Sequence, residues 1–209
     1  MVNRRDPDKT REALLAAAFE EIYAQGFRSA SIDNILRRTG VTKGALYHHF
    51  PNKNALGYAV VDDVIAPWAR EMMAPLDDPN LDPLDTLLRL AQEQLAEDTK
   101  DSVGGCPVNN LVHEMSGLDD GFRTRLDAIM LDWRDSIARA LRRGQQDGSV
   151  RQNIDADDAA AFSLAAYEGC ISIAKSSRHT DLYDACVRGM AAILGSLRAD
   201  PGNASTAVA

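Results

Sequence analysis

Helix-breaking residues in the first 52 positions constrain the fold more than any other feature of the sequence. Gly26, Gly40 and Pro51 separate three segments with apolar residues at helical spacing, over about 7–25, 31–39 and 42–50. A longer helix followed by two short ones joined by a turn of about four residues is typical of a helix-turn-helix. The sequence therefore predicts a small helical head at the N-terminus.

The charge distribution supports a nucleic-acid partner for this head. The chain as a whole has a net charge of −8, which is unusual for a DNA-binding protein. Residues 1–53, however, contain nine Lys/Arg and six Asp/Glu, a net charge of +3, so that the remainder carries −11. Positive charge concentrated at one end is the distribution that binding to phosphates requires.

The rest of the chain shows helical periodicity and few β-branched runs, which predicts an all-α fold. We expect a long helix over 53–73, then helices over about 83–99, 107–116, 119–147, 155–177 and 181–198. The expected organisation is a DNA-binding head (1–52), a larger helical bundle for ligand sensing and dimerisation (53–198) and a disordered tail (199–209). No apolar run of about 18 residues exists. The first ten residues are polar, unlike a signal peptide, so we expect a cytoplasmic protein.

The segment Thr42 to Phe50 (Thr-Lys-Gly-Ala-Leu-Tyr-His-His-Phe), followed by Pro-Asn-Lys-Asn-Ala-Leu, resembles the signature of TetR-family regulators. The supporting match runs from about Arg11 to Leu56, roughly a quarter of the chain. The resemblance implies a homodimeric repressor with two recognition helices in successive major grooves, and a small-molecule effector bound in the C-terminal domain. A two-fold dimer places its half-sites ~34–36 Å apart, so small movements between the heads change the affinity for double-stranded operator DNA.

Within the head, polar residues at or near the short helices are the candidates for DNA contact. Thr42 and Lys43 begin the recognition helix, where backbone amides and a positive charge attract phosphate. Tyr47 and His48 are placed for phosphate or base edges, although Tyr47 or His49 packing in the core is the alternative. The complete candidate set is Arg28, Ser31, Thr42, Lys43, Gly44, Tyr47, His48 and Lys53.

Cys106 is the most informative residue of the second region. It follows Gly104-Gly105 and precedes Pro107, which places it at a helix N-terminus that lowers a thiol pKa, with glycines that leave it sterically open. The region from Gly105 to Leu111 (Gly-Cys-Pro-Val-Asn-Asn-Leu) and the later Glu168-Gly169 to Lys175 also resemble a branch of the family that responds to reactive electrophiles, unsaturated acids such as acrylate, or reactive chlorine. That resemblance implies that Lys175 lies near Cys106. The alternatives are a capping cysteine without chemistry and an ordinary exposed lysine.

A pocket for the effector is expected inside the bundle. The candidate sensor residues, each of which is otherwise plain core or surface, are Cys106, His113, Met130, Trp133, Phe162, Tyr167 and Lys175. The last two helices are rich in small residues and are expected to form a four-helix interface with a second copy.

Other classes of protein fit less well. Cys106 and His113 are separated by about 10 Å of helical rise, which is too far for a nucleophile and its base. Neither metal-ligand spacings nor nucleotide-binding fingerprints occur, so we expect no enzyme, no metal site and no cofactor. A helical adaptor that does not bind DNA remains an alternative to a regulator. For a regulator, two modes of sensing remain open: reversible capture of an apolar or anionic ligand, and covalent modification of Cys106. The sequence specifies neither the effector nor the operator, nor repression against activation.

Overall fold

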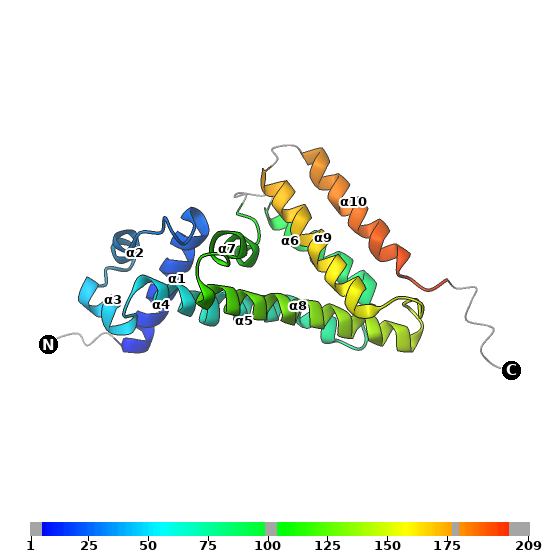
Figure 1. The fold of residues 1–209 in the computed structure, drawn as a ribbon, viewed down its shortest axis with the longest axis horizontal. Coiled ribbons are helices and arrows are strands. Elements are labelled where there is room, and N and C mark those ends of the chain that lie inside the picture. The colour runs from blue at the N-terminus through cyan, green and yellow to red at the C-terminus, as the bar shows by residue number, and fades with distance from the viewer. Residues whose placement is uncertain (1–5, 99–103, 177–179, 201–209) are drawn as a thin grey trace. The chain divides into compact units, whose positions relative to one another are not determined.

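The computed structural model describes residues 6–98, 104–176 and 180–200, and this part of the chain is helical without β-strands (Figure 1). The predicted all-α fold is confirmed. The helices are α1 (Pro7–Gln25), α2 (Ile32–Thr39), α3 (Lys43–His49), α4 (Lys53–Val60), α5 (Ala66–Met73), α6 (Pro83–Asp98), α7 (Pro107–Met115), α8 (Asp120–Asp147), α9 (Ala156–Ser176) and α10 (Thr180–Ser196). A π-helical turn (Val61–Ile65) and a 3₁₀ turn (Ala74–Asp77) flank α5. None of the described helices combines the length and the apolar character needed to cross a bilayer.

Short polar side chains begin the first four helices. The Asp6 carboxylate accepts from the amide of Asp8 at the start of α1. The Ser31 and Thr42 hydroxyls accept from the amides three residues later, each at 3.3 Å, and Asn52 caps α4 at 2.8 Å. Each cap satisfies a backbone amide that the first helical turn leaves without a partner. At the other end, Gly26 and Gly40 follow α1 and α2 with positive φ, a conformation that costs glycine little.

The predicted continuous helix over 53–73 is interrupted. At Val61–Ile65 the ladder widens to π-helical hydrogen bonds, and the Ala66 amide donates to the carbonyl of Val61, five residues earlier. Pro67 follows directly. Because proline has no amide hydrogen, it cannot bond to the carbonyl four residues before it, so the regular ladder is broken at this point in any case.

The described chain divides into two compact units. The first comprises residues up to Ala69 together with Pro107–Ile129, so α7 and the first part of α8 belong to the same unit as α1 to α4. Its core includes Leu14, Leu46 and Leu56. Phe122 of α8 completes it, with its ring centroid 4.5 Å from that of Phe27 and 5.0 Å from that of Tyr58. The predicted DNA-binding head ends at residue 52, and the compact unit that contains it extends beyond that residue. The head therefore stays a functional proposal within a larger structural unit.

The second unit contains Arg70–Cys106 and the chain from Met130 onward. Its largest fully buried side chain is Trp133, and Leu84 and Leu141 lie in the same core. Arg198, after α10, pairs with Asp82 at 2.9 Å and with Asp85 at 2.6 Å, which ties the end of the described chain to the start of α6. Helices α9 and α10 pack against each other and against α6 (Figure 1). The apolar cavity described below lies among these helices, with further walls from α5 and α8.

Candidate nucleic-acid interface and internal cavity

One face of α3 holds the helix in the head and the other is open to solvent. Leu46 is completely buried, and Phe50, the residue after the helix, is buried too. Tyr47 is 40% exposed, so the alternative that it packs in the core is not what the structure shows. A row of exposed residues, here called the α3 row, comprises Thr42, Lys43, Gly44, Tyr47 and His48. The α3 row therefore contains five of the eight residues predicted to contact DNA.

Ser31 is tied into the head by a buried carboxylate that the sequence did not reveal. Glu21 of α1 is almost fully buried, and it accepts from the Asn34 side-chain amide at 2.8 Å and from the Ser31 backbone amide at 3.2 Å. Arg38 lies 3.6 Å from the same carboxylate. The hydrogen bond from Asn34, with help from Ser31 and the nearby arginines, lowers the pKa of Glu21 against the opposing effect of burial. The carboxylate thereby fixes α2 against α1.

A second carboxylate, Glu114 near the end of α7, holds the loop before α2. Its two oxygens accept from the backbone amides of Phe27 at 2.7 Å and of Arg28 at 2.8 Å. The Lys53 ammonium donates to the carbonyl of Arg28 at 3.0 Å and lies 5.1 Å from the Phe27 ring centroid. Burial lowers the pKa of Lys53, partly offset by the charge of Glu114. Lys53 thus supports the loop that contains Arg28. Direct contacts from Lys53 and from the exposed Arg28 side chain to DNA phosphates stay predictions.

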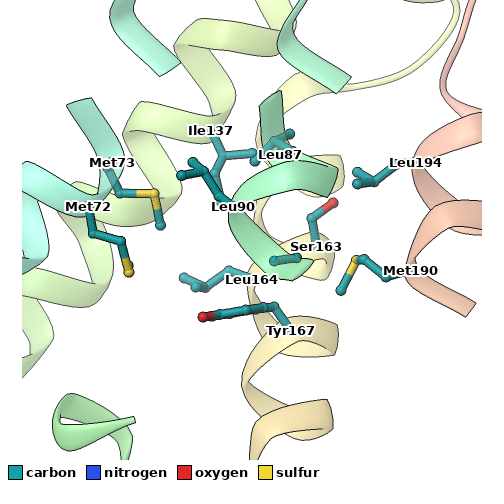
Figure 2. A pocket seen from close by; sticks show the side chains of 11 residues that line it. Met72, Met73, Leu87, Leu90, Ile137, Ser163, Leu164, Tyr167, Met190 and Leu194 are labelled. Carbon is teal, nitrogen blue, oxygen red and sulfur yellow. The ribbon is translucent and has the colours of Figure 1, made fainter. Parts of the chain in front are cut away.

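An apolar cavity of about 40 Å³ lies within the second unit (Figure 2). Its walls come from α5, α6, α8, α9 and α10 and include three methionines, Met72, Met73 and Met190. Tyr167 is the one predicted sensor residue among the lining residues. Trp133 is almost fully buried and Met130 is half-buried, but neither lines the cavity. Phe162 is 60% exposed because it lies on the outer side of α9, next to the inward-facing Ser163.

The side chain of Cys106 is buried in the structure. The expectation of a sterically open thiol is wrong, because Cys106 is only 6% exposed and the preceding Gly105 is buried as well. It does directly precede α7, as the sequence predicts. Lys175 of α9 is exposed, and His113 is exposed in the first unit. Among the described residues no group of three or more His, Cys, Asp or Glu side chains is arranged to hold a metal ion.

Large apolar side chains are exposed along the last two helices. Phe162 and Ile173 of α9 and Leu182 of α10 are each at least 40% exposed. Small residues, Ala161 and Ala165, are also exposed on α9. A surface of this composition permits close approach of another helical surface.

Comparison with known proteins gives a consistent picture. One family model, described as bacterial regulatory proteins of the tetR family, matches residues 14–60, and another, described as a tetracyclin repressor-like C-terminal domain, matches residues 83–190. The transcriptional regulator AcuR of Cereibacter sphaeroides is 31% identical over 179 residues, covering 84% of this chain and 81% of that protein. The HTH-type transcriptional repressor DhaR of a Mycobacterium species (strain GP1) is 27% identical, covering 83% of this chain and 86% of its own. The fold is similar to a crystal structure of E. coli NemR in its reduced form, with a TM-score of 0.82 and 24% identity, covering 92% of this chain and 98% of the other.

Proposed function

Because the chain belongs to the TetR family of bacterial regulatory proteins and is a transcriptional regulator, not an enzyme, we propose that its α3 row reads operator DNA and that a small molecule bound in the second unit controls that binding. The observation that carries the proposal is the division of α3 into a buried face and an exposed polar face. Leu46 and Phe50 anchor the helix, so that Lys43, Tyr47 and His48 are displayed on a rigid element. A protein that binds operator DNA in a bacterium acts in the cytoplasm.

The contacts divide into two kinds. Lys43 is proposed to neutralise a phosphate, a contact that adds affinity without reading sequence, whereas Tyr47 and His48 reach phosphate or base edges. Apart from its chain neighbours and the backbone of α3 itself, Gly44 has no atom within 4 Å of the position that a Cβ would occupy, so backbone and duplex can approach closely there. Arg28 and Ser31, held by the Glu114 and Glu21 carboxylates, are proposed to contact the backbone of the duplex from the start of α2.

We propose a homodimer built through α9 and α10. The exposed Phe162, Ile173 and Leu182 would be covered by the same residues of a second copy, with small residues allowing the helices to come close. An isologous interface of this kind is self-complementary and gives the two-fold symmetry that matches paired half-sites. A Phe162→Asp variant would place charges at the centre of this interface, and sedimentation should then show a monomer with reduced operator affinity.

For the effector, reversible capture in the cavity is favoured over covalent modification. A thiol that is 6% exposed is shielded from a reagent in solution, whereas the cavity is apolar and already formed. The covalent alternative has its own test. Cys106→Ser should bind DNA normally, and if electrophiles release DNA from the wild type but not from this variant, Cys106 is the sensor.

The direct experiment is fluorescence anisotropy on labelled DNA from the promoter region next to the protein's own gene, over a range of salt concentrations. Lys43→Ala should weaken binding and reduce the slope of log K against log salt by about 0.9, the value for one lost phosphate contact. Arg89→Ala is the matched control, because it removes one exposed positive charge from α6 in the second unit. If both variants bind as the wild type does, the α3 row is not the DNA-binding surface. A reporter gene under the same promoter distinguishes repression from activation.

A further inference from the structure

The cavity of the second unit contains a hydroxyl group whose hydrogen-bonding capacity is unused. Ser163 of α9 is 5% exposed, and its Oγ has no hydrogen-bond partner within the described part of the chain. The side chain belongs to the cavity wall, together with Leu87 of α6 and with Met190 and Leu194 of α10 (Figure 2). Buried polar groups almost always have a partner, protein or water, so an unpaired one at a cavity wall is available to a molecule that enters the cavity.

A second serine on the same helix shows what an ordinary helical serine does. Ser172, nine positions along α9, donates from its hydroxyl to the carbonyl of Glu168 at 2.9 Å, four residues earlier. This back-bonding satisfies the hydroxyl within the helix itself. Ser163 does not do so. Its hydroxyl can therefore donate to, or accept from, a molecule in the cavity.

The rest of the wall sets the charge of that molecule. The described lining residues comprise aliphatic side chains, the three methionines, Ser163 and Tyr167, with no charged side chain among them. Transfer of an anion from water into such surroundings is strongly unfavourable, because nothing there compensates for its lost hydration. A carboxylate effector would thus have no cationic partner among these residues, whereas a neutral molecule would bury its apolar part at little cost.

The volume sets the size. A cavity needs about 10–15 Å³ of this measure to hold one water molecule. The value here, about 40 Å³, therefore has room for about three or four groups of the size of water, and the pocket is partly open, so a molecule of about five atoms other than hydrogen fits if the wall adjusts slightly. Methionine side chains are flexible and unbranched, so Met72, Met73 and Met190 can yield to a slightly larger guest.

From these observations we infer that the effector of this regulator is a small, neutral molecule with a short apolar body and one hydrogen-bonding oxygen, such as a short-chain ketone, aldehyde or alcohol, which binds reversibly and pairs with the Ser163 hydroxyl. The inference rests on the proposed function, in which a ligand of the second unit controls DNA binding. It goes further by naming the chemical class and the residue that recognises it.

Three probes of nearly the same shape test the charge requirement. Butanone, propionamide and propionate share a CH₃CH₂C(=O)– group and differ only in whether methyl, amide nitrogen or an anionic oxygen completes it. Their dissociation constants for the DNA-free protein can be measured by ligand-observed NMR. Butanone is expected to bind at least about tenfold more tightly than propionate, with propionamide between them. Equal or tighter binding of propionate overturns the inference that the ligand is neutral.

Two variants test the site. Ser163→Ala should weaken butanone binding by about threefold to tenfold, the range for one net hydrogen bond, and should leave the melting temperature of the ligand-free protein unchanged or higher. Ser172→Ala is the matched control and should bind butanone as the wild type does. Ala91→Leu should fill the cavity and abolish binding while the protein remains folded by circular dichroism. If Ser163→Ala binds butanone with unchanged affinity, the serine does not recognise the ligand.

The failure of this inference can be distinguished from failure of the proposed function, because DNA binding is measured separately by anisotropy. A protein that binds its promoter DNA but none of the three probes retains the proposed function and refutes the ligand class. A protein that binds butanone through Ser163 but never binds promoter DNA supports the cavity assignment and refutes the function. In the expected outcome, butanone at saturation lowers the DNA affinity of the wild type and leaves that of Ala91→Leu unchanged.

Discussion

Replacing Glu114 by glutamine isolates the contribution of one carboxylate to the DNA-binding head. The native carboxylate accepts two backbone hydrogen bonds, from Phe27 and Arg28. The amide keeps one oxygen and points an NH₂ group at the other donor, so one bond is lost and the remaining one is no longer charge-assisted. A hydrogen bond to a charged group contributes about 1.5–3 kcal/mol to stability, and one of these two is exposed to solvent, so the expected loss is about 2 kcal/mol.

For a chain of this length, about 2 kcal/mol lowers the melting temperature by about 4–8 °C, which is measurable by circular dichroism. Operator affinity should fall as well, because the Arg28 loop is held less firmly. Glu20→Gln is the matched control: Glu20 is exposed on α1, and the same change there should leave the melting temperature within about 1 °C of the wild-type value. If Glu114→Gln melts together with this control, the two short hydrogen bonds contribute nothing to stability and the reasoning about the loop is refuted.

Four further outcomes are expected. Gly57→Ala should lower the free energy of unfolding in urea by about 1–3 kcal/mol, because the new Cβ would lie 2.7 Å from the Phe122 ring. Gly44→Ala has open space around the new Cβ, so it should raise stability by up to about 1 kcal/mol. The same variant should bind DNA more weakly in the anisotropy assay. The pKa of Glu21 is lowered in the folded state, so Glu21 stabilises the fold at pH values above its ordinary pKa of 4.5. This stabilisation is lost as the pH falls through the folded-state pKa. The melting temperature of a Glu21→Gln variant should therefore decrease less on acidification than that of the wild type. Burial and the neighbouring Cys186 thiol raise the pKa of Cys170 to about 12. Iodoacetamide should therefore alkylate Cys170 on the order of a thousandfold more slowly than a free thiol near neutral pH. Mass spectrometry that finds Cys170 labelled before the other cysteines would contradict this.

Much of the candidate DNA-binding surface could be predicted from the sequence because the features involved are local. The caps at Ser31 and Thr42 bond three residues ahead, and the buried positions Leu46 and Phe50 follow helical spacing. The exposure of the α3 row is the consequence, since residues opposite a buried stripe must face outward. The effector site was harder to predict. Helical periodicity distinguishes buried from exposed positions, but it does not show which buried residues pack against each other and which line a cavity.

The amino-acid sequence by itself determined the three helices of the head, their ends and the face of α3 that stays in solvent, because capping bonds and amphipathic spacing act over no more than about four residues. Only the tertiary structure decided the roles of Glu114, whose partners lie 86 and 87 positions away, and of Ser163, which faces a cavity. It also decided that Cys106 is buried despite its flanking glycines. The physical reason is that burial and long-range hydrogen bonds depend on which helices pack together, and residues far apart in the chain meet only after that packing is complete.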